Sequence, residues 1–455
     1  MHNIKEKAEY CLNCKNKPCS LKGCPLNNDI PEFINAVKQE QFENAYEILT
    51  ETTVLPSICG RICPHFKQCM GSCVRGIKGE AVHIGELEAF IGDLAFENNF
   101  KIKNLSQEKA LKNNTGKENY EITNVKTSNK DISIKSEVEK ENKKTTKNIA
   151  IIGGGPAGLT AAAFLARTGY KVTIYEKYNY LGGLLVHGIP SFRLSKDIVQ
   201  KSVNKITDLG ISVKYNQELG KNLKLKDLEK NYDYVILGFG ANVSSKANIV
   251  GENLEGVYGA NELLEYNNHP NYEGKVVVVY GGGNVAMDTA RTIKRLGAKR
   301  VIVVYRRAKE QMPAEQKEVE DAINEGIEFL LQHKIVKIIG RFRHDLVQDI
   351  PDSVHKIELI KTELVKKDEE HRLVPIDIEN SNYEIEADYV VMAIGSKPAD
   401  FVKNMGLELD RNGYIKVDEN GKTSKQKIYA IGDLAGNIAT VAWAARSGRK
   451  IHFEN

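Results

Sequence analysis

The chain lacks cysteine over most of its length. Its 455 residues include eight cysteines, and all of them lie between Cys11 and Cys73. There is one tryptophan, and the longest apolar stretch, residues 148–166, is interrupted by a run of glycines that begins at Gly153. That interruption favours a strand, a turn and a helix start over a membrane-spanning segment. No membrane partner is therefore expected.

The chain also lacks an excess of charge of one sign. Its 64 basic and 60 acidic residues give a net charge of +4, which gives no argument for a nucleic-acid partner. The length suggests about three domains, and 41% hydrophobic residues with 37 glycines are consistent with a globular α/β chain. The opening residues include no apolar signal region, so we expect a cytoplasmic location.

The eight cysteines form two runs whose spacing indicates a metal-binding domain. The first run reads C-x2-C-x4-C-x4-C-P from Cys11, and the second reads C-x3-C-P-x4-C-x3-C from Cys59. Cys-Pro pairs recur where chains wrap iron–sulfur clusters, and eight thiolates match the need of two 4Fe–4S clusters. Structural zinc is an alternative, although only Cys11 and Cys14 form the short pair that zinc sites repeat. Disulfides are a second alternative, which a reducing compartment disfavours.

The composition changes twice along the chain. Residues 1–100 hold the cysteines and helical patterns, one opening at residue 30 and another over residues 42–49. Residues 101–147 are rich in Lys, Asn, Glu, Ser and Thr, which predicts a flexible linker, with a basic docking tail as the alternative. Beyond it, short β-branched runs alternate with helical patterns, as in parallel α/β units.

A glycine-rich loop follows the strand expected over residues 148–152. It reads G-x-G-x-x-G: Gly153 allows a tight turn, Gly155 allows close approach to a pyrophosphate, and Gly158 lets helix and strand pack closely. The N-terminus of the following helix offers free N–H groups to phosphates. The next strand ends at Glu176, the position of an acid that binds ribose hydroxyls. The pattern predicts a dinucleotide site rather than a coincidental turn.

A second glycine-rich loop, residues 281–286, reads G-x-G-x-x-A after a valine-rich strand. The strand after it ends in Arg306 and Arg307 instead of an acid. An acid there would repel a 2′-phosphate, whereas paired guanidiniums can bind it, so NADP(H) is favoured over NAD(H). Ordinary surface arginines at a strand end are the alternative.

A chain with two such loops usually binds FAD at one and a nicotinamide cofactor at the other. Glycines just after Glu176 suit close approach to a bulky flavin, and a Gly-Asp strand end followed by a late helix start favours the same domain. The candidate cofactor-binding residues in these segments are Gly153, Gly155, Pro156, Ala157, Gly158, Glu176, Lys177, Gly182, Gly183, Leu184, Gly432, Asp433, Thr440 and Val441 for FAD, and Gly281, Gly283, Asn284, Val285, Ala286, Arg306 and Arg307 for NADPH.

The expected fold is α/β, with two Rossmann-like dinucleotide-binding domains preceded by an α-helical iron–sulfur domain. The FAD-binding domain is interrupted by the NADPH-binding domain. The expected segments are the helical domain with two 4Fe–4S clusters at 1–100, the linker at 101–147, the FAD-binding domain at 148–260 and 386–455, and the NADPH-binding domain at 261–385.

Four segments together resemble the small (beta) subunit of NADPH-dependent glutamate synthase. They are Cys11–Cys24, Ile58–Pro64, Gly182–Leu194 and Tyr305–Arg307. The resemblance covers nearly the whole chain except the linker. The same module is similar to the N-terminal half of dihydropyrimidine dehydrogenase and to the large subunit of the bifurcating NADH-dependent ferredoxin:NADP oxidoreductase.

The resemblance implies FAD, NADPH and two 4Fe–4S clusters, with a hydride passing to the flavin and electrons leaving singly through the clusters. It also implies a larger partner subunit or ferredoxin as electron acceptor, in a homo- or hetero-oligomer. A bifurcating subunit and a non-catalytic iron–sulfur scaffold are the alternatives. No general acid or base is nominated, and His187 is expected to be structural.

The resemblance further implies how the clusters are bound. One cluster would use the first three cysteines and the last, which are Cys11, Cys14, Cys19 and Cys73. The other would use Cys24, Cys63 and Cys69, completed by Glu88, and would leave Cys59 as a nearby non-ligand. A solvated helix residue is the alternative for Glu88. Arg193, in the resembling segment, is a further candidate for cofactor binding.

Overall fold

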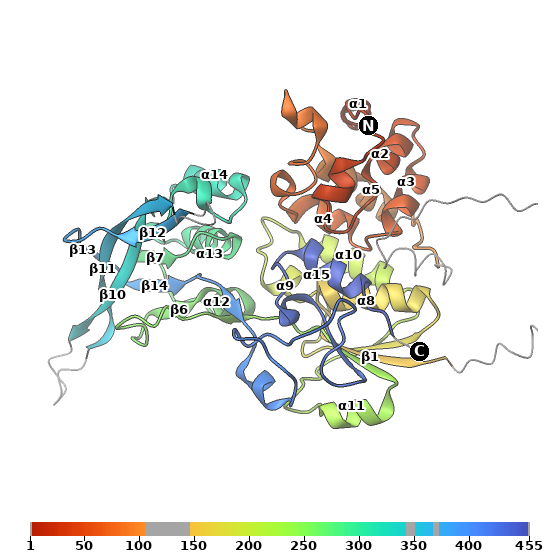
Figure 1. The fold of residues 1–455 in the computed structure, drawn as a ribbon. Helices are drawn as coiled ribbons and strands as arrows, with labels where there is room; N and C mark the ends of the chain where they lie inside the picture. The colour runs from red at the N-terminus through yellow and green to blue at the C-terminus, as the bar shows by residue number, and fades with distance from the viewer. Residues whose placement is uncertain (1, 105–145, 343–350, 367–372, 454–455) are drawn as a thin grey trace, which may run out of the picture. The chain divides into compact units, whose positions relative to one another are not determined.

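The computed structural model describes residues 2–104, 146–342, 351–366 and 373–453 (Figure 1). Most of the expected linker, residues 105–145, lies outside the described residues. The chain divides into two compact units. The first unit contains Met1–Leu181, Gln200–Phe239 and Ile415–Asn455, and the second contains Gly182–Val199 and Gly240–Tyr414. Within the described ranges, no helix is long and apolar enough to cross a membrane.

The N-terminal part of the first unit is helical because its apolar residues recur at helical spacing. The predicted helices that open at residues 30 and 42 are confirmed, and the first of them buries Phe33, Ile34 and Val37. A Cβ on Gly60, in the helix Pro56–Ile62, would lie 2.5 Å from backbone atoms of the helix Ile84–Glu97. The helices Pro56–Ile62 and Ile84–Glu97 therefore pack closely. The elements are α1 (His2–Glu9), η1 (Cys19–Gly23), α2 (Ile30–Lys38), α3 (Phe42–Thr50), α4 (Pro56–Ile62), η2 (His65–Lys67), η3 (Val74–Ile77) and α5 (Ile84–Glu97).

The rest of the first unit is a parallel sheet with helices. Its order is β16-β4-β1-β2-β3, and residues 149–151 are fully buried because β1 is the central strand. The strands are β1 (Asn148–Ile152), β2 (Lys171–Tyr175), β3 (Ser212–Lys214), β4 (Tyr234–Leu237) and β16 (Ile428–Ala430). The helices are α8 (Pro156–Arg167), α10 (Lys196–Thr207, which contains the boundary between the units), α11 (Leu225–Asn231), η6 (Gly432–Ala435) and α15 (Val441–Arg449). The strands predicted on either side of the first glycine-rich loop are confirmed.

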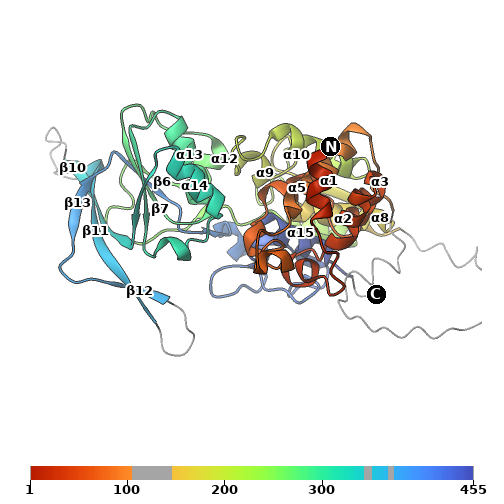
Figure 2. The same cartoon turned by 90° about the horizontal axis from the view of Figure 1, so that it is seen from above.

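The second unit is built on another parallel sheet, of order β6-β14-β7-β8-β9. Its strands are β6 (Val257–Gly259), β7 (Val276–Tyr280), β8 (Arg300–Tyr305), β9 (Glu328–Leu331) and β14 (Tyr389–Met392). Successive residues of β7 face opposite sides. Val277 and Val279 pack with helical residues such as Met287, whereas Val278 packs with Ile357 of an antiparallel layer. Figure 2 shows the antiparallel strands on one side of this sheet and α13 and α14 on the other.

That antiparallel layer was not predicted. It contains β10 (His333–Phe342), β11 (Pro351–Lys366), β12 (Leu373–Asp377) and β13 (Tyr383–Glu386). Apolar and charged residues alternate along β11, which is the pattern of a strand with one buried face. The remaining elements of this unit are α9 (Leu184–His187), β5 (Val243–Ser244), α12 (Ala260–Tyr266), α13 (Asn284–Arg295), η4 (Lys309–Gln311), α14 (Gln316–Asn324), β15 (Ser396–Lys397) and η5 (Asp400–Asn404).

The boundaries of the two units differ from the expected segments. The NADPH-binding segment was expected to end at residue 385, but β14 pairs with β7 and belongs to the second sheet. The second unit accordingly extends to Tyr414, and it also includes residues 182–199.

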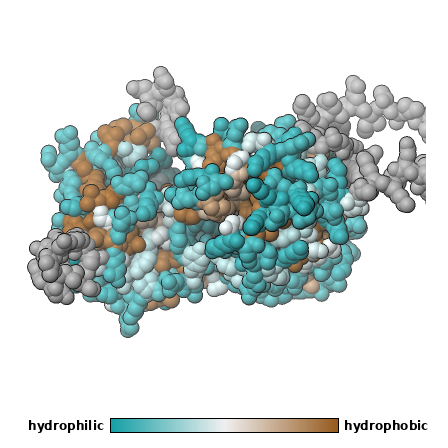
Figure 3. All heavy atoms as spheres, turned by 90° about the horizontal axis from the view of Figure 1, so that it is seen from below, coloured by the Kyte–Doolittle hydropathy of each residue, from teal (hydrophilic) through white to brown (hydrophobic). Residues whose placement is uncertain are grey.

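On the face of the molecule drawn in Figure 3, hydrophobic residues are interspersed with hydrophilic ones.

Candidate functional site

The first glycine-rich loop joins β1 to α8. Gly153 has a φ of 100°, and a Cβ there would lie 2.7 Å from the carbonyl oxygen of Gly238. A Cβ on Gly158 would lie 2.0 Å from the carbonyl oxygen of Gly153, so the first turn of α8 closes directly on the loop. Gly155 is the N-cap and Pro156 opens the helix. The free N–H groups of this first turn are the donors that a pyrophosphate needs.

Glu176 directly follows β2 and holds the middle of this loop. Its Oε2 accepts a hydrogen bond from the Gly154 N–H at 2.7 Å, and its Oε1 accepts one from the Tyr178 N–H at 3.0 Å. Burial raises the pKa of Glu176, and these N–H groups oppose the rise. Lys177, beside it, is exposed and lies over the Tyr178 ring. The acid expected to bind ribose therefore also fixes the loop.

The Gly-Asp strand end lies beside the same helix. A Cβ on Gly432 would lie 2.9 Å from the Cβ of Ala157. The Oδ1 of Asp433 is buried and has no hydrogen-bond partner among the described residues, and burial raises the pKa of Asp433 to about 6. Thr440 caps α15 by accepting a hydrogen bond from the Trp443 N–H at 3.4 Å, and Val441 is the first helical residue. This part of the first unit thus brings the N-termini of α8 and α15 and the Asp433 carboxylate oxygen, which has no partner among the described residues, to the candidate site.

The second glycine-rich loop joins β7 to α13. Gly281 has a φ of 152°, and a Cβ there would lie 2.1 Å from the carbonyl oxygen of Ala393. Gly283 is the N-cap of α13, and Asn284 begins the helix. The Oδ1 of Asn284 accepts a hydrogen bond from the Glu315 N–H at 2.9 Å, which ties the start of α13 to the start of α14. Val285 is half-buried and Ala286 is fully buried.

Two arginines follow β8, as the sequence indicated. Arg306 is exposed, and Arg307 is half-buried with an Nε that is buried and has no hydrogen-bond partner within the described ranges. A Cβ on Gly282 would lie 2.6 Å from the Tyr305 ring, so the loop packs on the residue just before the arginines. Burial raises the pKa of Tyr305, and both guanidiniums oppose the rise.

The segment of residues 182–199 belongs to the second unit. Gly182 and Gly183 have φ of 124° and 54°, and Leu184 begins α9. The Nζ of Lys196 donates to the carbonyl oxygens of Leu185 and Ile189, and burial lowers the pKa of Lys196 to about 8. The side chain of Lys196 therefore holds this segment together through the segment's own carbonyl groups.

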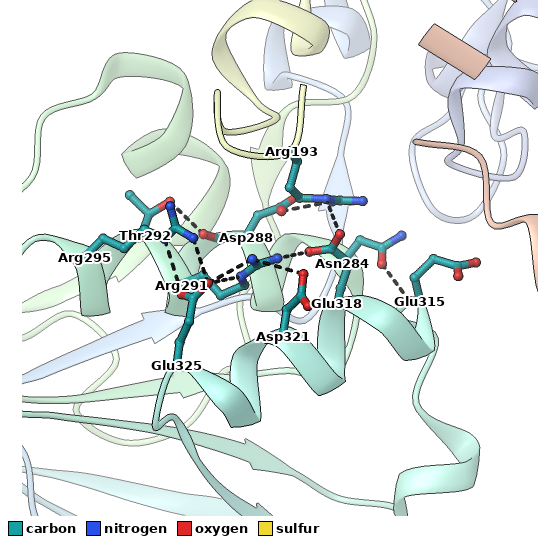
Figure 4. Close-up of polar contacts among 10 residues, drawn as sticks. All are labelled: Arg193, Asn284, Asp288, Arg291, Thr292, Arg295, Glu315, Glu318, Asp321 and Glu325. Carbon is teal, nitrogen blue, oxygen red and sulfur yellow. Dashed lines mark hydrogen bonds and ion pairs between the residues drawn. The ribbon is translucent and has the colours of Figure 1, made fainter. Parts of the chain in front are cut away.

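Arg193, a predicted cofactor-binding residue, joins a buried ion network (Figure 4). Its Nη1 contacts Asp288 Oδ1 and Oδ2 at 2.9 and 2.8 Å, and its Nε contacts Glu318 Oε1 at 2.9 Å. Arg291 binds the other oxygen of Glu318 and also contacts Glu325 at 2.9 Å. These contacts join residues 182–199 to α13 and α14.

The sequence reasoning missed Asp288 and Glu318. Burial raises the pKa of Asp288 to about 6, and Arg193 opposes the rise. Phe192 adds to the same junction, because the guanidiniums of Arg291 and Arg295 lie 4.7 and 4.0 Å from its ring centroid. The available signal was a carboxylate at position 288 in the middle of a helix whose residues Ala286, Met287 and Ala290 are buried.

We expect Glu318→Gln to destabilise the packing of residues 182–199 against α13 and α14 by about 3 kcal/mol. Removing one partner of a buried ion pair leaves the other charges uncompensated. The side chains of Glu318, Arg193 and Arg291 are 12%, 7% and 6% exposed. Hydrogen exchange of α13 and α14 amides measures the local change. Glu328→Gln is the control, because Glu328 and Arg300 pair at 2.8 Å with about half of each side chain exposed. Its expected effect is below about 1 kcal/mol; equal effects would contradict the buried network's role.

One group of cysteines lines a pocket among the N-terminal helices. The first cysteine group is Cys11, Cys14, Cys19 and Cys73, and the pocket walls include Ile30, Ile34, Val82 and Ile84. Burial, with the nearby Cys11 and Cys73, raises the pKa of Cys19 to about 11. A bare thiolate is therefore disfavoured here, whereas bound iron would favour it.

A second group lies on α4 and α5 and in the loops that follow η1, α4 and η2. The second cysteine group is Cys24, Cys59, Cys63, Cys69 and Glu88, whose charges act on one another. Burial, then Glu88, raises the pKa of Cys24 to about 12. The Glu88 side chain is buried, its Oε1 accepts a hydrogen bond from Asn28 Nδ2 at 3.2 Å, and burial raises its pKa strongly.

The cysteine thiols of the two groups are the donor type that iron–sulfur clusters take. All eight cysteines are unbridged. In the described part of the chain, no three His, Cys, Asp or Glu side chains are close enough to hold one metal ion. A zinc site places four ligands on one ion, whereas each ligand of a 4Fe–4S cluster binds a different iron and stands further from the others.

Comparisons with known proteins match the N-terminal helical part and the rest of the chain to two different families. Residues 147–448 match the family described as pyridine nucleotide-disulphide oxidoreductase. Residues 1–100 match the family described as dihydropyrimidine dehydrogenase domain II, 4Fe-4S cluster. In fold, the chain is similar to Mycobacterium tuberculosis FprA in complex with NADPH, with a TM-score of 0.58 and 21% identity, covering 67% of this chain and 83% of that chain.

Curated relatives span nearly the whole chain. It is 33% identical over 467 residues to the glutamate synthase [NADPH] small chain of Escherichia coli (strain K12), covering 98% of this chain and 89% of that protein. It is 32% identical over 465 residues to the glutamate synthase [NADPH] small chain of Azospirillum brasilense, covering 98% of this chain and 86% of that protein. It is also 33% identical over 449 residues to the NADP(+)-dependent formate dehydrogenase subunit beta of Moorella thermoacetica, covering 95% of this chain and 58% of that protein.

Proposed function

Because the chain belongs to the family of glutamate synthase [NADPH] small chains, we propose that it passes electrons from NADPH through FAD and two 4Fe–4S clusters to a partner protein. It is an NADPH-dependent flavoprotein oxidoreductase with a 4Fe–4S domain. The observation that carries the proposal is that two glycine-rich loops of dinucleotide type occur in one chain and only the second leads to paired arginines. Such a chain binds two different dinucleotides.

The second unit binds NADPH in this proposal. The glycine-rich loop and the first turn of α13 hold the pyrophosphate with backbone N–H groups. Arg306 and Arg307 bind the 2′-phosphate. The buried Nε of Arg307, which has no partner in the described chain, supports this role because a phosphate oxygen would satisfy it.

The first unit supplies the loop, the first turn of α8 and Glu176 to FAD. The buried Oδ1 of Asp433 is an acceptor without a partner, as expected of a residue that binds a hydroxyl of the cofactor. If FAD binds as proposed, the partial positive charge at the N-terminus of α15, which Thr440 caps, would stabilise the reduced flavin. Residues 182–184 and Lys177 remain proposed contacts, and so does Arg193, whose known partners are carboxylates.

The cofactors carry the redox chemistry when bound: NADPH gives up a hydride, the flavin takes up its two electrons, and the clusters pass them on one at a time. The chain's own residues bind and orient these groups and exclude water from them. We assign no side chain as general acid or base. Cysteines that must stay reduced to bind iron are consistent with the proposed cytoplasmic location.

A larger subunit is the partner that we propose, from the small-chain relatives. The similarity to a formate dehydrogenase subunit beta favours a second candidate, in which the same electron-transfer chain serves a different oxidoreductase. A bifurcating complex that also couples ferredoxin remains an alternative. Co-purification distinguishes them: a large amidotransferase supports the first candidate, a formate-oxidising subunit the second, and a small flavoprotein the bifurcating complex.

We expect protein purified without oxygen to hold one FAD and about eight irons per chain. It should reduce a one-electron dye with NADPH and should form no glutamate from glutamine by itself. Metal analysis, flavin release and the dye assay measure these properties. Zinc in place of iron would overturn the cluster assignment, and bound FAD without NADPH oxidation would overturn the electron-input role.

A further inference from the structure

The C-terminal helix α15 is hydrogen-bonded to two loops among the N-terminal helices, one that follows Cys24 and one that precedes α4. The guanidinium of Arg446 donates to the carbonyl oxygen of Pro25, the residue after Cys24. One turn later, Arg449 Nη1 donates to the carbonyl oxygen of Thr52 at 3.2 Å. A Cβ on Gly448 would lie 2.2 Å from the carbonyl oxygen of Ala157, so α15 is fixed closely against α8. The position of Arg449 is thus set by packing.

Arg449 brings a positive charge into the protein interior. It is 6% exposed, no carboxylate pairs with it among the described residues, and its Nε is buried without a hydrogen-bond partner there. Burial lowers its pKa to about 10, and the Cys24 thiolate opposes that fall. The guanidinium is therefore charged at neutral pH, and the negative group that acts on it is a proposed cluster ligand.

A chain of hydrogen bonds continues from this arginine to the carboxylate of the second cysteine group. The hydroxyl of Thr52, whose carbonyl oxygen binds Arg449, donates to Asn28 Oδ1 at 2.7 Å. That bond orients the amide so that Asn28 Nδ2 donates to Glu88 Oε1 at 3.2 Å. The Arg449 relay, defined as Arg449, Thr52 and Asn28, thus connects α15 to Glu88.

We propose that the Arg449 relay raises the reduction potential of the iron–sulfur cluster whose proposed ligands lie in the second cysteine group, namely Cys24, Cys63, Cys69 and Glu88. This inference rests on the proposed function, because it requires that cluster. Reduction adds one electron and changes no bond, so the reduced cluster carries one more negative charge. A buried positive charge and hydrogen bonds to the ligands stabilise the more negative state. Arg449 acts through its charge, and Asn28 through its bond to the carboxylate.

The test measures the potentials of both clusters in the full-length holoprotein by redox titration followed with electron paramagnetic resonance. Arg449→Gln removes the charge, and its amide ends two bonds short of the Nη1 that donates to the Thr52 carbonyl oxygen. We expect it to lower one cluster's reduction equilibrium constant at least tenfold, which is about 59 mV for one electron. Arg449→Lys retains the charge and should leave both potentials near the wild-type values.

Arg167→Met is the matched control. Arg167 is 3% exposed, and it donates to the carbonyl oxygens of Thr50 and Lys103 at 2.7 and 2.6 Å. It is therefore the same kind of buried anchor, but the charged neighbours that act on its pKa are Tyr46 and Glu51, not a cysteine. Its loss should leave both cluster potentials unchanged, even if it lowers the melting temperature.

The outcomes separate this inference from the proposed function. A wild-type protein without iron would overturn the proposed function itself. With two clusters present in the wild type, unchanged potentials in Arg449→Gln would overturn the inference, and so would an equal shift in Arg167→Met. If Arg449→Gln fails to hold iron, the near-isosteric Thr52→Val decides, because it removes only the hydroxyl that orients Asn28. It should lower the same potential by a smaller amount, and no shift would overturn the inference.

Discussion

Replacing Glu88 with alanine is expected to remove one of the two proposed clusters, so that iron falls from about eight to about four per chain. Glu88 is a carboxylate at the buried face of α5, within the second cysteine group. A buried carboxylate without a compensating positive charge is costly, and Asn28 supplies only one neutral hydrogen bond. Iron would compensate the charge. Iron analysis and electron paramagnetic resonance of protein purified without oxygen measure the loss.

Two variants control this experiment. Glu86→Ala, two residues earlier on α5, removes an exposed carboxylate that pairs with Lys7 and should retain all the iron. Cys59→Ser removes the thiol that lies 3.9 Å from the Thr53 hydroxyl, and it should retain both clusters if Glu88 is the ligand. Loss of a cluster in Cys59→Ser, with unchanged spectra in Glu88→Ala, would instead assign four cysteines to each cluster.

Replacing both Arg306 and Arg307 with alanine is expected to raise the KM for NADPH roughly 100-fold and to change the KM for NADH little. Each hydrogen bond to a charged phosphate contributes about 1.5 kcal/mol or more, and 1.4 kcal/mol is a factor of ten. NADH has no 2′-phosphate to lose these contacts. Steady-state dye reduction with both cofactors measures the change.

Arg300→Ala is the matched control for the arginine pair. Arg300 begins the strand that the pair follows, and its partner Glu328 lies on the neighbouring strand. Its loss should leave the KM for both cofactors unchanged. Equal increases for NADPH and NADH in the double variant would mean that Arg306 and Arg307 do not bind the 2′-phosphate.

The features predicted well from the sequence depend on local patterns. The strands before and after both glycine-rich loops were predicted because each β-branched run is followed by a glycine or by a charged residue. Gly153 illustrates this, since its φ and the approach of Gly238 both require glycine. The antiparallel strands β10–β13 were missed, although apolar and charged residues alternate along β11, because the β-branched runs were interpreted only as strands of parallel α/β units.

The parts of the site that could not be predicted involve residues distant in sequence. Arg193 and Asp288 are 95 positions apart, and no local pattern pairs them. The two cysteine groups mix members of both runs, so spacing alone suggested four ligands from each. Resemblance to a family supplied the mixed assignment, which remains a prediction. Asn28 and Arg449 gave no signal at all, because an amide and an arginine are ordinary surface residues until burial is known.

The bonds from α15 to the N-terminal helices also bear on how the protein is made. Arg446 binds a residue 421 positions earlier, and Arg449 binds one 397 positions earlier. At about 5–20 residues per second, a ribosome needs on the order of 20 to 80 seconds to complete that interval. During this time the cysteine-bearing loops exist without the helix that anchors them. Stable incorporation of the proposed second cluster is therefore expected only after α15 has been made.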